Sequence, residues 1–174
     1  MAPKNILDLL AGADRRTIGR ADQVARLVGK NLALFPKLIA GLWSEDPVIR
    51  MRAADAVEKI TRTAPAQLQR YKKELLGLMA EADQQELRWH LAVMVPRLSL
   101  KPAERRRAAE LLSGYLEDRS SIVRTFALQG LADLAQQEPS MRATVTDLLR
   151  ESVRSGTPAM RARSRKLLLQ LERD

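Results

Sequence analysis

The segment "DPVIRMRAADAVEKI" (residues 46–60) is followed by three further segments with the same pattern of residue types. Each segment carries an arginine preceded by an apolar residue, and these arginines are separated by 38, 36 and 37 residues: Arg50, Arg88, Arg124 and Arg161. Apolar side chains return seven and ten positions after each arginine, as Val57 and Ile60 do after Arg50. Such offsets place them on one face of a helix, and a period of this length is typical of helical repeat proteins.

A second helix is predicted between successive copies of this segment, and a proline marks the start of each one: Pro36, Pro65, Pro102 and Pro139. Proline is tolerated in the first turn because the N–H that it lacks has no partner there. The unit is therefore helix, turn, helix, and four units are expected at about 33–62, 64–98, 101–136 and 138–172. A capping helix is expected over 21–30, so that 21–174 form one domain after a partly ordered segment, 1–20.

Two residues inside the expected helices have particular consequences. Pro96 lies eight residues after Arg88, where it should kink or end the second helix of its unit. Trp43 ends an apolar helix before a turn, and we expect it in the core.

Composition excludes several classes of site. The chain has no cysteine and one histidine, which rules out thiol catalysis, Cys-ligated metals and a multi-histidine metal site within one chain. We therefore expect neither a cofactor nor a bound metal. The apolar stretch near the N-terminus is too short and too polar for a secretory signal, and no apolar stretch is long enough to span a membrane. We therefore expect a cytoplasmic protein.

The turn and helix "SEDPVIRMRAADAVEKI" resembles the HEAT-repeat consensus, in which acidic residues and proline precede Val-Arg or Ile-Arg and then Ala and Leu at helical spacing. This resemblance covers nearly the whole chain and implies a right-handed α-solenoid whose second helices line a concave groove. It also implies that Arg50, Arg88, Arg124 and Arg161 are structural, since the family's arginines pair with turn carboxylates between repeats. Only Asp118 and Arg124 keep the family's spacing.

Three positions in each second helix face away from the apolar stripe and should line the groove. With Trp89, which flanks them, they supply the candidate interaction surface: Arg52, Lys59, Trp89, His90, Arg97, Phe126, Arg163 and Lys166. The two aromatics could instead fill gaps between helices, and His90 could be a surface residue without a role. Arg165 takes a position that is apolar in the other units, which suits either an exposed capping helix or a phosphate-binding rim.

The sequence favours a non-enzymatic scaffold that binds another protein through the groove. A net charge of +9 keeps nucleic-acid binding open as the alternative, because DNA-alkylation-repair glycosylases are built from similar repeats. For glycosylase chemistry, Asp133 or Asp55 would have to supply the catalytic carboxylate. A third hypothesis is an accessory role in cofactor attachment, as in lyase-type HEAT proteins. The oligomeric state stays open.

Overall fold

The computed structural model describes residues 5–173, and every regular element in that range is a helix. The predicted all-α class is confirmed for these residues. Two compact units are distinguished, one ending at Tyr71 and the other beginning at Lys72. The single domain and continuous solenoid predicted over 21–174 stay predictions.

The first unit consists of three α-helices joined by 3-10 turns. Its elements are η1 (Ile6–Leu9), α1 (Ala21–Lys30), η2 (Leu32–Leu34), α2 (Phe35–Ala40), η3 (Gly41–Trp43), α3 (Pro47–Thr61) and η4 (Pro65–Tyr71). Helix α1 has the bounds that the sequence predicts, and it packs on α3. The core between these elements includes Val24, Leu38 and Val57, all fully buried.

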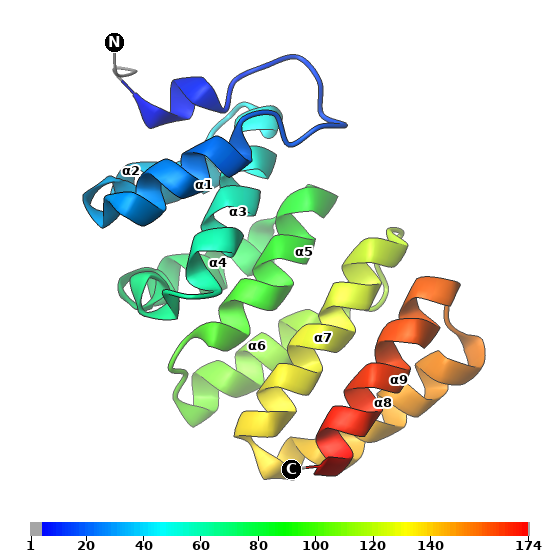
Figure 1. The fold of residues 1–174 in the computed structure, drawn as a ribbon. Coiled ribbons are helices and arrows are strands. Elements are labelled where there is room, and N and C mark those ends of the chain that lie inside the picture. The colour runs from blue at the N-terminus through cyan, green and yellow to red at the C-terminus, as the bar shows by residue number, and fades with distance from the viewer. Residues whose placement is uncertain (1–4, 174) are drawn as a thin grey trace. The chain divides into compact units, whose positions relative to one another are not determined.

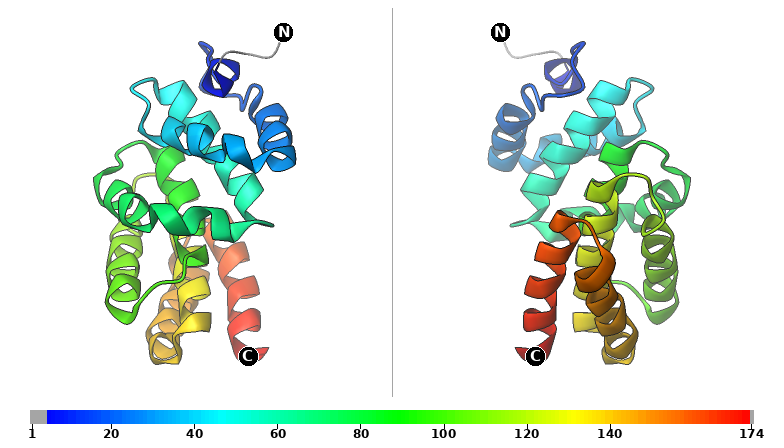
Figure 2. Two further views of the ribbon diagram at one scale, coloured as in Figure 1. Left: turned by 90° about the vertical axis from the view of Figure 1, so that its left-hand side faces the viewer. Right: turned by 90° about the vertical axis from the view of Figure 1, so that its right-hand side faces the viewer.

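The second unit consists of three helix pairs. Its elements are α4 (Lys72–Glu81), α5 (Gln85–Met94), η5 (Val95–Arg97), α6 (Pro102–Tyr115), α7 (Ser121–Gln137), η6 (Pro139–Met141), α8 (Arg142–Ser155) and α9 (Pro158–Arg173). Helix α7 lies between α5 and α9 (Figure 1), and these three form what we call the second-helix layer. Helices α4, α6 and α8 are the first helices of the pairs. The last pair, α8 and α9, is joined by a short turn and packs closely (Figure 2).

Two of the four prolines start an α-helix as predicted, while α4 and α8 begin later than expected, at Lys72 and Arg142. Pro36 and Pro102 lie in the first turn of α2 and α6, while Pro65 and Pro139 begin the 3-10 turns that lead into α4 and α8. Helix α5 ends at Met94 and the chain tightens into η5 around Pro96, which confirms the early termination.

Trp43 is not a core residue. Its exposed fraction is 44%, so the prediction that it is buried is wrong. Helix α2 gives way to the 3-10 turn η3, and the tighter winding turns Trp43 away from the side on which Leu42 is buried.

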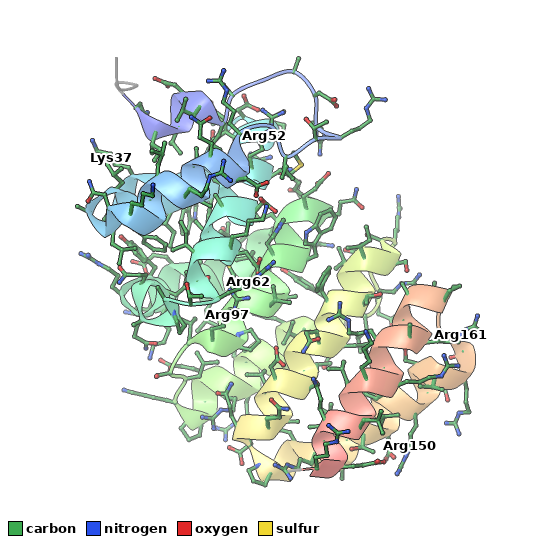
Figure 3. The ribbon with its side chains drawn as sticks, viewed as in Figure 1. Lys37, Arg52, Arg62, Arg97, Arg150 and Arg161 are labelled. Atoms are coloured by element: carbon green, nitrogen blue, oxygen red, sulfur yellow. The ribbon has the colours of Figure 1, made fainter. Side chains whose placement is uncertain are left out.

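Arg52 holds the chain segment that precedes α1. Its guanidinium donates hydrogen bonds of 2.9 to 3.2 Å to four main-chain carbonyl oxygens, those of Leu10, Ala11, Asp14 and Thr17. Gly12 and Gly19 have positive φ angles, and a Cβ at either position would come within 2.7 Å of this guanidinium. Residues 5–20 are therefore part of the first unit, folded over α3 (Figure 3).

Gly130 allows α7 to approach α5. A Cβ at Gly130 would overlap the carbonyl oxygen of Ala92 and lie 3.0 Å from a methyl group of Leu112. The side chains on both sides are packed in the core and leave little room for adjustment.

We expect Gly130→Ala to destabilise the protein by about 1–3 kcal/mol, because the added methyl group forces α5 and α7 apart. Gly77 lies in α4 with open space around it, so Gly77→Ala should instead stabilise by about 0.5–1 kcal/mol. Urea unfolding followed by circular dichroism measures both. Equal effects of the two substitutions would contradict the close approach of α5 and α7.

We expect Arg52→Met to destabilise the first unit by on the order of 3 kcal/mol. The four carbonyl oxygens lose their hydrogen-bond donor, and because they are partly buried, water cannot fully replace it. The segment should then open, and trypsin should cleave after Arg15 and Arg16 faster than in the unaltered protein. Arg26→Met is the control, since Arg26 is an exposed arginine on α1 of the same unit. Unchanged cleavage in Arg52→Met would show that other contacts hold the segment.

Candidate interaction surface

Two of the repeat arginines close the turn that precedes their own helix. Arg50 donates a 2.7 Å hydrogen bond to the carbonyl oxygen of Ser44, and Arg88 donates one of 2.6 Å to that of Ala82. Both acceptors lie six residues before the arginine, where the preceding helix ends and its carbonyl groups lack partners within the helix. These bonds are what the structural role predicted for Arg50 and Arg88 requires.

Arg88 also links two neighbouring helix pairs. Its guanidinium forms an ion pair with the Asp118 carboxylate and lies over the Tyr115 ring, whose hydroxyl donates a 2.6 Å hydrogen bond to the Met79 carbonyl oxygen. Burial alone would raise the pKa of Asp118, but the Ser120 backbone N–H and Arg88 hold it below its usual value. The ion pair of Arg88 and Asp118 thus joins α5 to the turn after α6.

The other two repeat arginines are half-buried. Arg124 lies near Asp118 and contributes to the low pKa of that carboxyl, although its Nε atom is buried without a hydrogen-bond partner. Arg161 lies in the first turns of α9 (Figure 3), and its structural role stays a prediction.

Arg52 and His90 do not belong to an outer surface, and both predictions are wrong. Arg52 is only 5% exposed because the segment of residues 10–17 covers it. His90 is 9% exposed; its Nδ1 lies 2.6 Å from the Glu86 carbonyl oxygen and its ring packs on Trp89. A hydrogen bond to the preceding helical turn thus occupies one nitrogen of the only imidazole.

Lys59 is held by two carboxylates within the first unit. Its Nζ lies 2.5 Å from an Asp22 oxygen and 2.7 Å from an Asp55 oxygen. Burial would lower the pKa of Lys59, but these hydrogen bonds raise it above its usual value. Lys59 lines a pocket of about 370 Å³ with Asp22, Arg26 and Ile60, where it serves as a structural cation.

The second-helix layer brings two of the predicted groove residues, Phe126 and Arg163, together with Gln129 and Asp133. Arg163 on α9 donates a 2.8 Å hydrogen bond to the Gln129 side-chain oxygen, and its guanidinium lies 5.6 Å from the centre of the Phe126 ring. Gln129 in turn donates a 2.8 Å hydrogen bond to an Asp133 carboxylate oxygen. We call Phe126, Gln129, Asp133 and Arg163 the α7 cluster; all four side chains are half-buried.

Asp133 is the carboxylate within this cluster. Desolvation raises its pKa above the usual value, although the hydrogen bond from Gln129 and the charges of Arg97 and Arg163 act in the opposite direction. Arg97 lies at the end of η5, so cations from two elements face this one acid. The group can accept a proton or hydrogen bonds from a bound molecule.

The remaining candidates lie on α5 and α9. Trp89 on α5 is half-buried, as Phe126 is, and packs on His90. Lys166 and Arg165 are exposed on α9, as a terminal helix allows. The sequence indicated these positions through their offsets from the repeat arginines, but it did not indicate the hydrogen-bonded chain from Arg163 to Asp133.

Comparison with known proteins identifies no relative: no protein-family model matches the chain, and no curated protein is significantly similar to it. Among residues 5–173, His, Asp and Glu form no group of three or more that could hold a metal ion. Within that same range, no helix is both long and apolar enough to cross a bilayer.

We expect Asp133→Asn to remove a dependence of stability on pH. Because the pKa of Asp133 is higher in the folded than in the unfolded chain, its contribution to stability is full below the unfolded pKa and is lost as the pH rises through the folded pKa. The stability of Asp133→Asn relative to the unaltered protein should therefore increase between about pH 4 and about pH 7. Urea unfolding at several pH values tests this, and a difference that is constant with pH would contradict it.

Proposed function

We propose that this chain is a HEAT-like repeat protein and that it acts as a non-enzymatic scaffold in the cytoplasm. Three observations support the architecture: the paired helices of the second unit, the contacts of α7 with both α5 and α9, and the bond from Arg88 to Asp118 between pairs. The lack of cysteine fits a reducing compartment.

We further propose that the second-helix layer binds another protein. The observation that carries this proposal is the mixed character of the α7 cluster, in which a half-buried aromatic, an amide, a carboxylate and an arginine are neighbours. Protein interfaces combine partly exposed aromatic and arginine side chains with hydrogen-bonding groups in this way. In a groove that binds the phosphates of a nucleic acid, a carboxylate among the cations would repel the ligand.

Nucleic-acid binding is the second candidate function, and the exposed cations of α9 are the observation in its favour. Fluorescence anisotropy with labelled duplex DNA, single-stranded DNA and RNA at about 50 and about 200 mM salt tests it. Binding that weakens steeply with salt would support nucleic acid as the ligand. We expect no such binding.

To test protein binding, a photo-reactive amino acid is placed at Gln170, which is exposed on α9, or at Ser113, which is exposed on α6. After irradiation in cells that naturally contain the protein, we expect a discrete cross-linked partner from position 170, because this position borders the proposed surface. The measurement is the set of cross-linked products, identified by mass spectrometry.

Position 113 is the control, since α6 is a first helix and lies outside the proposed surface. The same partner captured equally from both positions would contradict a binding surface on the second-helix layer. Cross-links to nucleic acid alone from position 170 would favour the second candidate function.

A further inference from the structure

The two sets of helices in the second unit differ in their balance of charge. The second-helix layer with η5 carries eight cations, namely Arg88, Arg97, Arg124, Arg161, Arg163, Arg165, Lys166 and Arg173, and three carboxylates, namely Glu86, Asp133 and Glu172. The first helices carry eight cations, namely Lys72, Lys73, Arg105, Arg106, Arg107, Arg142, Arg150 and Arg154, and six carboxylates, namely Glu74, Glu81, Glu104, Glu110, Asp147 and Glu151. The excess of positive charge is therefore larger on the second-helix layer.

Burial increases this difference at the surface. Glu86 is 8% exposed and Asp133 is half-buried, so Glu172 is the layer's exposed acid within residues 72–173. Three of the six acids of the first helices instead form ion pairs: Glu104 with Lys72, Asp147 with Arg150 and Glu151 with Arg154.

The exposed cations of the layer gather on α9. Arg165, Lys166 and Arg173 are all exposed, whereas Arg88 is bonded to Asp118 and Arg163 to Gln129. Spacings of three, four and seven residues put Lys166, Leu169 and Arg173 on one side of the helix, with Arg165 one turn before Leu169. Leu169 is 55% exposed among these three cations and the exposed Glu172, which lies three residues after it.

We infer that this side of α9, defined by Arg165, Lys166, Leu169 and Arg173, docks an acidic segment of a partner protein that also carries an apolar side chain. This inference rests on the proposed function and names the chemical class of the partner. Carboxylates of the segment pair with the three cations, and its apolar side chain covers Leu169, which otherwise faces water.

The same observations disfavour a nucleic acid on this surface. A strand of nucleic acid binds through a run of phosphates and through bases stacked on open aromatic rings. Here Phe126 has Arg163 over its ring and Trp89 packs on His90, so each aromatic ring already has a neighbour within the layer. Leu169, which lies among these cations, can form no hydrogen bond to a phosphate, but it can pack against an apolar side chain of a protein.

The test uses an array of random peptides of about a dozen residues, which are long enough to cover several helical turns. We expect the unaltered protein to bind peptides more tightly as their content of Asp and Glu rises, with a further gain from one Leu, Ile or Phe. In R165E/K166E this dependence should disappear, and affinity for the best peptides should fall by about tenfold or more, because like charges then face each other. Leu169→Ala should remove the apolar preference alone.

The matched control is R106E/R107E, which makes the same change of charge at two adjacent exposed arginines of α6. It should leave peptide binding unchanged. Equal losses in both variants would show a general charge effect and overturn the inference, as would binding that is independent of acidic content. Labelled single-stranded DNA that competes fully with the best peptides would also overturn it.

The inference and the proposed function can fail separately. If position 170 cross-links a protein while the array shows no preference for acidic peptides, the second-helix layer binds a protein of another class. If position 170 cross-links no protein and the array shows no preference, both proposals fail.

Discussion

The folded chain depends on guanidinium groups that donate to main-chain carbonyl oxygens. The last carbonyl groups of every helix lack partners within the helix, and in short connections few other donors are near. Arg50 and Arg88 supply donors at the turns of their own helix pairs, and Arg52 supplies them to a whole segment. Arginine suits this task because its planar group carries five N–H donors and remains charged when partly buried.

This use of arginine changes what the net charge means. Of the +9 that the chain carries, a part is placed where no partner molecule can reach it, as Arg52 is. Further cations, among them Lys59 and Arg88, are neutralised by carboxylates of their own unit. The charge that remains accessible in the second unit is most concentrated on α9, so any attraction for an acidic partner is local and does not extend over the whole surface.

The hydrogen-bonded side chains of the α7 cluster both hold two helices together and keep polar groups partly exposed for binding. The chain of hydrogen bonds from Arg163 through Gln129 to Asp133 fixes α9 against α7. The same chain keeps a carboxyl of raised pKa half-exposed between cations. Because opposite charges lie side by side, the cluster suits the varied surface of a protein better than the uniform charge of a phosphate backbone.

The sequence by itself determined the helical class, the starts of α2 and α6 and the break at Pro96, because proline geometry and apolar periodicity act locally. The repeat pattern also predicted a structural role for Arg50 and Arg88, and both bond to main-chain carbonyl groups of the turn before their helix. Only the tertiary structure decided that Arg52 and His90 are buried, that Trp43 is exposed and that Arg163 reaches Asp133 through Gln129. Those outcomes depend on which segment covers a helix face, and Arg52 is covered by residues 35 to 42 positions away, which periodicity within one helix cannot reveal.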